Sequence, residues 1–150
     1  MKTRGFEIAK GYENKDIHLP LRKTAKSAGY DVEAAEDIII PIYKPGIKPT
    51  LIPTGLKAYC ADDEFYMLVN RSSGPKKGLL MANSIGIIDA DYYCNETNDG
   101  HFYFQYFNCS DHDIEIKKGD IIGQVIFMKY LTVDNDYATG IRTGGFGSTD

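Results

Sequence analysis

The feature that most constrains this sequence is that its apolar runs are short and never extend into a helical pattern. No window of ten or more residues carries a convincing helical apolar period. Runs rich in Ile, Val, Tyr and Phe alternate instead with clusters of Gly, Pro, Asn and Asp, which is typical of strands joined by turns. The pattern predicts strands over residues 5–9, 31–34, 38–42, 50–52, 55–59, 65–69, 78–81, 85–88, 101–107, 113–116 and 121–128, with possible helical turns over 61–65 and 72–77.

The prolines support these boundaries. Pro41, Pro45, Pro49 and Pro53 all fall where strands are expected to end, because proline cannot donate to a strand ladder. A chain of 150 residues with 43% hydrophobic and 25% charged residues is normally one soluble globular domain. We therefore expect a single all-β domain over residues 1–150, built as a sandwich, jelly roll or barrel.

Composition excludes several classes of partner. The net charge of −4 and the lack of any basic run longer than two residues, such as Lys76-Lys77, argue against nucleic-acid binding. No apolar stretch approaches the length of a membrane span, and the N-terminus leads into no signal-peptide core. Cys60, Cys94 and Cys109 are odd in number, share no CxxC spacing and form no zinc pattern with the three histidines. We expect a cytoplasmic protein with reduced thiols, no nucleic-acid partner and no membrane contact.

An acidic pair follows the apolar run over residues 85–88. Asp89 ends that run, Asp91 lies two residues later, and Tyr92 offers a flat ring for a sugar or a base. A carboxylate at the end of a buried strand is fixed in position and partly shielded from water, which suits a general base. Most sequences of this kind end a strand in a solvated turn, so the stretch alone is only a candidate site for hydrolysis of a nucleotide-like substrate.

The strand predicted over residues 101–107 carries aromatic residues on both faces. Such a strand is either central to the core or buried against another subunit. Residues 95–100 form a strong turn sequence. We therefore expect the strand over 85–92 and the strand over 101–107 to pair as one long hairpin, with residues 93–100 as its connection.

Three further stretches carry side chains suited to phosphate or metal. Asp31 follows a glycine turn and opens a strand, which is also the pattern of an ordinary turn. Arg71-Ser72-Ser73-Gly74 offers a guanidinium, two hydroxyls and backbone N–H groups to an anion, although the same residues could form a helix cap. Gln124 interrupts the apolar run over 121–128, where a buried amide must find partners and could simply satisfy the backbone.

The glycine-rich C-terminal segment could close over a ligand. Successive glycines let backbone N–H groups turn inward as an anion-binding nest, and Phe146 among them could stack on a base. The segment is not a Walker loop, because no Gly-Lys-Ser/Thr follows the required spacer. A glycine-rich terminus is usually only flexible.

The order and content of these stretches resemble the trimeric, all-β dUTP diphosphatase (dUTPase) family. Five motifs match in family order and span almost the whole chain: Ala28-Gly29-Tyr30-Asp31, Arg71-Ser72, Gly86-Ile87-Ile88-Asp89-Ala90-Asp91-Tyr92, Gly119-Asp120 with Gln124, and Gly144-Gly145-Phe146-Gly147-Ser148-Thr149. The resemblance implies a distorted jelly roll or β-clip sandwich. It also implies a homotrimer with shared active sites, in which a C-terminal arm over about residues 139–150 reaches a neighbouring subunit.

The resemblance also implies roles for individual residues. Asp89 would be the general base that activates a water attacking the α-phosphorus of dUTP, releasing dUMP and pyrophosphate. This reaction limits uracil incorporation into DNA and supplies dUMP for thymidylate synthesis. Asp31 would hold Mg²⁺ through water, and Tyr92 would exclude a 2′-hydroxyl. The remaining implied contacts are Asn83 and Phe146 to uracil, and Arg71, Ser72, Gln124, Arg142, Ser148 and Thr149 to the phosphates. Ser73 and Gly147 are implied as further substrate-binding residues.

The chain departs from the family pattern at several positions. Asn70 stands where a proline is usual, Ile121 replaces a common arginine, and Gly123 replaces alanine. Arg142 also sits one residue closer to the glycines than in the commonest pattern, and the connection over 93–100 is longer than usual. Ser73, moreover, replaces the usual glycine of the second motif.

Three alternatives remain open. A dCTP deaminase shares the fold, but its catalytic glutamate precedes an asparagine by three residues, where this chain has Gln105 before Asn108. A dUTPase-like nucleotide sensor would use the long 93–100 connection to bind a regulatory protein partner. A structural jelly roll without chemistry is the third alternative.

Overall fold

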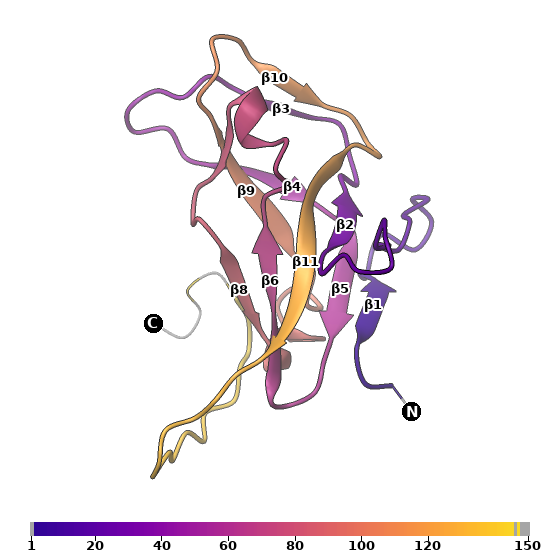
Figure 1. The fold of residues 1–150 in the computed structure, drawn as a ribbon, viewed down its shortest axis with the longest axis vertical. Coiled ribbons are helices and arrows are strands. Elements are labelled where there is room, and N and C mark those ends of the chain that lie inside the picture. Colours follow the sequence, from indigo (N-terminus) through magenta and orange to yellow (C-terminus); the bar gives the residue numbers. More distant parts are fainter. Residues whose placement is uncertain (1, 146, 148–150) are drawn as a thin grey trace.

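The computed structural model describes residues 2–145 and 147, and its fold is almost entirely β. Figure 1 shows the arrangement of the elements. The first strands are β1 (Gly5–Ile8), β2 (Tyr30–Glu33), β3 (Ile38–Ile40), β4 (Thr50–Pro53), β5 (Leu56–Tyr59) and β6 (Glu64–Val69). They are followed by β7 (Leu79–Met81), β8 (Gly86–Asp89), β9 (Tyr103–Asn108), β10 (Ile114–Ile116) and β11 (Ile121–Lys129). Two short 3₁₀ turns, η1 (Pro75–Lys77) and η2 (Ala90–Tyr92), complete the set.

The strands form two main antiparallel sheets and two paired ribbons. The larger sheet has the order β2-β11-β6-β8, and the smaller has the order β4-β9-β7. β1 pairs with β5, and β10 pairs with β3. The predicted all-β class is therefore confirmed, and the predicted strands agree with the observed ones to within a few residues. The jelly-roll description remains a prediction.

The predicted pairing of the strand over 85–92 with the strand over 101–107 is wrong. β8 pairs with β6, where Asp89 lies opposite Phe65, and β9 lies between β4 and β7 in the other sheet. The chain leaves β8 through η2 and then through turns that are held by the Asn95 side chain, which donates to the Tyr92 carbonyl oxygen at 2.8 Å. These turns carry the chain away from the larger sheet, so the two strands never become neighbours.

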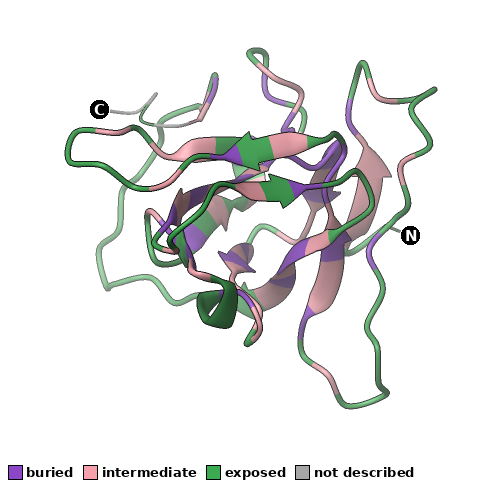
Figure 2. Cartoon of the chain, turned by 90° about the horizontal axis from the view of Figure 1, so that it is seen from above, coloured by how far each residue is buried: buried purple, intermediate pink, exposed green. Residues whose placement is uncertain are grey.

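The hydrophobic core lies between the two main sheets, and the side chains on the inner face of β9 are part of it. Phe104 and Tyr106 are fully buried, whereas Tyr103, Gln105 and Phe107 on the other face are half-buried. Figure 2 shows the same alternation of buried and less buried residues along the strands. The aromatic strand is therefore a core strand on one of its faces.

Gly123 allows β11 to approach this aromatic core. A Cβ atom at Gly123 would lie 2.2 Å from Phe104 Cε1, which no side chain can tolerate without a shift. The glycine that departs from the family pattern is thus explained by the aromatic ring that occupies the space. None of the helical segments among the described residues is long and apolar enough to cross a membrane.

Candidate functional site

The first part of the candidate site lies where β8 ends, and we call Asp89, Asp91 and Tyr92 the Asp89 corner. Asp89 is the last residue of β8, and η2 then places Asp91 and Tyr92 beside it. The Tyr92 ring is buried, its hydroxyl donates to the His101 carbonyl oxygen at 2.6 Å, and it accepts from Asn98 Nδ2 at 2.7 Å. Tyr92 is therefore fixed in place, while the carboxylates of Asp89 and Asp91 are 57% and 59% exposed.

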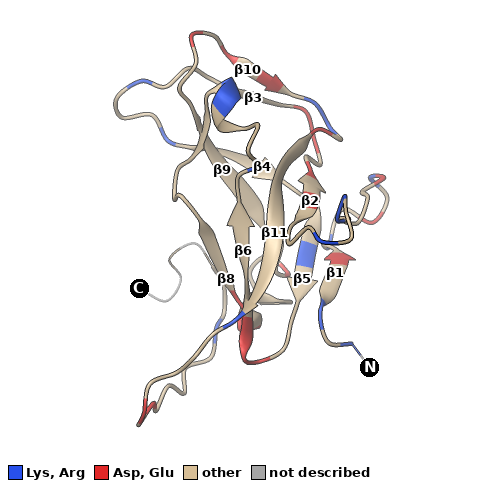
Figure 3. Ribbon diagram, viewed as in Figure 1, with Lys and Arg blue, Asp and Glu red and all other residues tan. Residues whose placement is uncertain are grey.

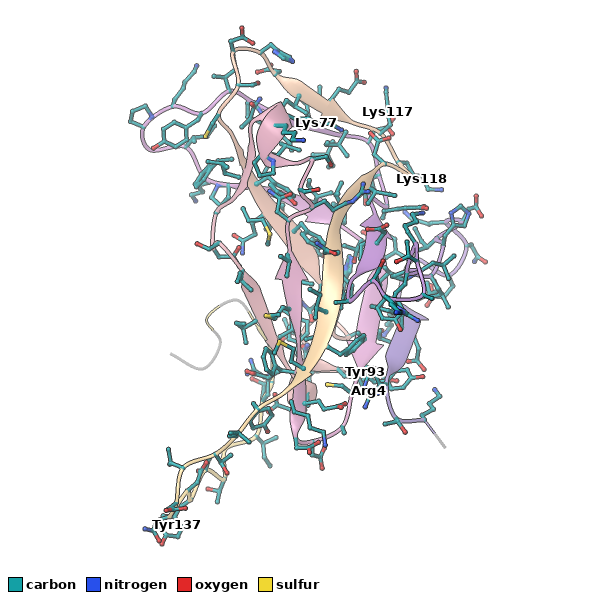
Figure 4. The ribbon with its side chains drawn as sticks, viewed as in Figure 1. Arg4, Lys77, Tyr93, Lys117, Lys118 and Tyr137 are labelled. Carbon is teal, nitrogen blue, oxygen red and sulfur yellow. The ribbon has the colours of Figure 1, made fainter. Side chains whose placement is uncertain are left out.

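The C-terminal segment returns to this corner and covers part of it. Figure 4 shows Tyr137 at the outer tip of the segment that follows β11. From that tip the chain runs back until Arg142 donates from Nη2 to Asp89 Oδ2 at 2.6 Å and from Nε to Asp91 Oδ1 at 2.7 Å. The guanidinium is only 16% exposed, and Nη1 donates to the Gly144 carbonyl oxygen at 3.1 Å.

Two further contacts hold the same segment. Thr97 Oγ1 donates to the Thr143 carbonyl oxygen at 2.9 Å, so the long 93–100 connection supports the arm. Gly145 packs against the Tyr92 ring so closely that a Cβ atom there would lie 2.3 Å from Cε1. The arm therefore lies on the Asp89 corner of its own chain, and its reach to a neighbouring subunit remains a prediction, because the structure contains one chain.

An open groove of about 870 Å³ adjoins the Asp89 corner. One wall comes from the end of the larger sheet, and the other comes from the segment that follows β11. Its lining residues are Asp62, Phe65, Ile87, Asp89, Ala90, Asp91, Tyr130, Ala138, Gly140 and Arg142. The volume is in the range of small-molecule sites in proteins, and the Asp89 carboxylate faces it.

The second part of the candidate site lies at the opposite end of the larger sheet, and we call Asp31, Arg71 and Gln124 the Arg71 corner. Asp31 on β2 lies directly opposite Gln124 on β11, and Arg71 Nε lies 3.4 Å from Asp31 Oδ1. Gln124 Nε2 donates to the Asn70 carbonyl oxygen at 3.2 Å. Gly29 is required here, because a Cβ atom would lie 1.9 Å from Gln124 Oε1.

Asn70 has a structural role that explains its departure from the family pattern. Its Nδ2 donates to the Leu79 carbonyl oxygen at 2.9 Å, and its Oδ1 lies 3.2 Å from the Tyr106 hydroxyl. The turn that follows brings Gly74 close to the same amide. Ser72, which is exposed, and Ser73, which is half-buried, lie in this turn beside Arg71.

The two corners are far apart in one chain. On β6, Phe65 lies opposite Asp89 and Val69 lies opposite Gln124. These two positions are four residues apart, which corresponds to about 13 Å along the strand. The three strand spacings from β8 to β2 add about 14 Å in the perpendicular direction, so the corners lie about 20 Å apart. A single chain therefore cannot place Asp89 and Asp31 around the same phosphorus atom.

The other predicted residues are distributed as follows. Asn83 is exposed in the turn that precedes β8, at the opposite end of that strand from Asp89. Gly147 is exposed with φ near +90°, and Phe146, Ser148 and Thr149 lie outside the described residues. The sequence reasoning missed the contacts of Asp91 and Thr97 with the arm, because no local pattern links residues about fifty positions apart.

Comparison with known proteins gives a consistent result. A dUTPase family model matches residues 15–150. The deoxyuridine 5′-triphosphate nucleotidohydrolase of Lactococcus lactis subsp. lactis (strain IL1403) is 48% identical over 152 residues, which is 99% of each protein. The crystal structure of dUTPase from Streptococcus mutans matches with a TM-score of 0.80 and 40% identity, over 87% of this chain and 99% of that one.

A more distant likeness concerns the fold alone. The structure of a mutant Staphylococcus bacteriophage 80alpha dUTPase with dUpNHpp matches with a TM-score of 0.71 at 18% identity, over 99% of both chains. The family model and the Lactococcus lactis relative extend through both corners described above. The chain therefore belongs to the dUTPase family.

Proposed function

We propose that this protein hydrolyses dUTP to dUMP and pyrophosphate, with Asp89 as the general base for a water that attacks the α-phosphorus. The observation that carries the proposal is that described residues of the family motifs form two corners, one of which presents the Asp89 carboxylate to an open groove. Phosphoryl chemistry needs positioning and charge neutralisation more than covalent help, and these corners supply carboxylates, guanidinium groups and an amide.

The proposed cellular role follows from that reaction. Removing dUTP limits uracil incorporation into DNA, and the dUMP product supplies thymidylate synthesis. All three cysteines are free thiols, which supports the proposal of a cytoplasmic location.

Tyr92 and β8 are the proposed recognition elements for the nucleoside. Because two hydrogen bonds fix the Tyr92 hydroxyl, its ring is a rigid surface against which a 2′-hydroxyl would clash. β8 is the last strand of its sheet, so its outer edge presents backbone donors and acceptors that suit the edge of a uracil ring. With Asn83 at its start, this edge would reject a base that leaves its hydrogen-bonding groups unpaired.

A second copy of the chain is proposed to complete the site. Because the corners lie about 20 Å apart in one chain, the Asp89 corner of one copy must meet the Arg71 corner of another. The outer face of β8, β6 and β11 is suited to this contact, since Figure 3 shows charged residues only at the ends of these strands. This face carries Phe65, Met67, Ile87, Ile126 and Met128, and it runs between the two corners.

A closed homotrimer is the assembly that we propose. A head-to-tail contact between two different patches closes into a ring when the rotation is suitable, and each ring then contains as many complete sites as it has chains. In such an assembly the arm of one chain could lie on the Asp89 corner of a neighbour instead of its own. Its contacts would be the same in both cases, because the chains are identical and exchange of an identical segment preserves the contact geometry.

Mg²⁺ is the proposed cofactor. No group of three or more His, Cys, Asp or Glu side chains in residues 2–145 and 147 could enclose a metal ion. Asp31 is a single carboxylate with its side chain 12% exposed. Mg²⁺ usually keeps several waters and binds through one or two carboxylates and substrate phosphates, so Asp31 fits the ion through a water. The ion would neutralise phosphate charge beside Arg71.

The remaining phosphate contacts are proposed from both corners. Arg71, Ser72, Ser73 and Gln124 would hold phosphate oxygens at one corner. At the other, the arm would order over the bound nucleotide and exclude water. Its proposed contacts are Phe146 on uracil, and Arg142, Gly147, Ser148 and Thr149 on the phosphates.

The test is pyrophosphate release from dUTP, UTP, dTTP and dCTP, with Mg²⁺ and with a chelator, for the wild type and Asp89→Asn. We expect release from dUTP alone, its loss with the chelator, and its loss in the variant. Ammonia release from dCTP would instead indicate the deaminase alternative. Tight dUTP binding without turnover by the wild type would contradict the proposed reaction.

A further inference from the structure

Arg142 is shared between two carboxylates that contact it in different ways. Its terminal Nη2 donates to Asp89, the proposed base, whereas the inner Nε donates to Asp91. Both distances, 2.6 and 2.7 Å, are those of charge-assisted hydrogen bonds. The guanidinium is mostly buried although both carboxylates are more than half exposed, so the contact encloses the cation rather than the acids.

These two contacts have opposite consequences for the proposed reaction. Asp89 Oδ2 accepts a hydrogen bond from Arg142, so release of Nη2 would free this oxygen for the water that Asp89 activates. A triphosphate offers stronger acceptors for the same guanidinium. The contact with Asp91 need not break during this exchange, because Nε and Nη2 are different donors on one rigid planar group.

We propose that Asp91 is a positioning residue that holds Arg142 through Nε, so that Nη2 can pass from Asp89 to a phosphate oxygen while the arm stays in place. This inference rests on the proposed dUTP hydrolysis and adds to it a residue that touches neither the water nor the phosphorus. Asp91 acts through Arg142 alone.

The other contacts of the arm are consistent with a fixed pivot at Asp91. Thr97 holds the Thr143 carbonyl oxygen, and Gly145 lies against the Tyr92 ring. The segment that follows Arg142 is therefore placed by contacts that do not involve Asp89. Exchange of Nη2 between Asp89 and a phosphate thus requires movement of the guanidinium ends and not of the whole arm.

The test is a double-mutant cycle on dUTP hydrolysis with the wild type, Asp91→Asn, Arg142→Ala and the double variant. Loss of one charge-assisted hydrogen bond predicts about a tenfold fall in kcat/KM for Asp91→Asn. The fall should appear mainly as a raised KM, because Arg142 contacts phosphates in the bound substrate and in the transition state alike. In the Arg142→Ala background, Asp91→Asn should have no further effect.

Two control variants separate positioning from a structural defect. Asp91→Glu keeps the carboxylate and should recover most of the lost kcat/KM. Glu96→Gln makes the same charge change at an exposed residue of the neighbouring loop and should match the wild type. A damaged fold would instead lower kcat through a smaller active fraction and leave KM unchanged.

A measurement without substrate tests the contact independently of turnover. Trypsin should cut after Arg142 several times faster in Asp91→Asn than in the wild type, as followed by mass spectrometry. Equal cleavage rates, or effects of Asp91→Asn and Arg142→Ala that multiply in the double variant, would overturn the inference. Lack of turnover by the wild type would overturn the proposed function instead, and the cleavage rates would still decide whether Asp91 holds Arg142.

Discussion

Tyr66 offers a sharp test of how the core of this protein is built. It lies in the middle of β6, it is 1% exposed, and its ring contacts Phe102 and Phe127 at centroid distances of 5.6 and 5.7 Å. Within residues 2–145 and 147, its buried hydroxyl has no hydrogen-bond partner. Burial accordingly raises the pKa of this hydroxyl well above its usual value. Tyr66→Phe removes only the unpaired oxygen and keeps the ring.

The expected gain in stability can be worked from this environment. An unpaired buried hydroxyl costs about 1–3 kcal/mol, and the small void that its removal leaves offsets part of the gain. We therefore expect Tyr66→Phe to raise the free energy of unfolding by about 1 kcal/mol. For a chain of this length, that change corresponds to a rise in Tm of about 2–4 °C.

Tyr106 provides a matched control, because it is equally buried and its hydroxyl is paired. It donates to the Ile122 carbonyl oxygen at 2.5 Å, and Asn70 Oδ1 lies 3.2 Å from the same hydroxyl. Tyr106→Phe should therefore lower the free energy of unfolding by about 1–3 kcal/mol. Both variants are compared with the wild type by calorimetry and urea unfolding at one fixed protein concentration. A Tm for Tyr66→Phe at or below that of the wild type would refute the reasoning and indicate a bound water on the hydroxyl.

Three further predictions test the core, the pH dependence and the metal. Gly123→Ala should lower the free energy of unfolding by about 1–3 kcal/mol, because its Cβ would lie 2.2 Å from Phe104, and adding Phe104→Leu should recover most of the loss in urea unfolding. Burial lowers the pKa of His101 to about 4, so the unfolded chain gains the proton first and stability should fall by up to about 3 kcal/mol as the pH drops from about 6.5 to about 4. His101→Gln should lack this part of the pH dependence, and equal slopes for both proteins would contradict it. Asp31→Asn should raise the Mg²⁺ concentration for half-maximal dUTP hydrolysis by about tenfold, whereas an unchanged Mg²⁺ titration would remove Asp31 from the metal site.

Local patterns in the sequence were sufficient to predict the strands. The apolar run Phe65–Val69 indicates a strand, and the proline at the end of β4 indicates where a strand ends, without knowledge of the fold. The pairing of strands was not predictable in the same way. The strand over residues 85–88 was expected beside the one over 101–107 because they are consecutive in sequence. The turns after Asp89 instead send the chain to the other sheet, where Phe104 and Tyr106 can be buried.

The candidate site shows the same division between local and long-range information. Asp89 and Asp31 could each be chosen from a short motif, since the family pattern around them is local. The contact of Arg142 with Asp89 and Asp91 depends on where a long segment returns to the sheet, so no motif contains it. The separation of the two corners depends on the register of β6 with both of its neighbours, which also cannot be read from one stretch.

The central claim is that one dUTP-hydrolysing site combines the Asp89 corner of one copy with the Arg71 corner of another. Mixed assemblies test this claim directly. Asp89→Asn and Arg71→Ala chains are unfolded in urea, mixed in equal amounts, refolded together and assayed for pyrophosphate release from dUTP. In random mixing, each corner comes from an intact chain half of the time, so about one site in four should be complete.

The control is a mixture of Arg71→Ala with Asp31→Asn, whose changes lie in the same corner and cannot complement each other. We predict recovery of about a quarter of the wild-type rate in the first mixture and no recovery in the control. Release in the first mixture that stays at the level of the two separate variants would contradict a site shared between copies of the chain.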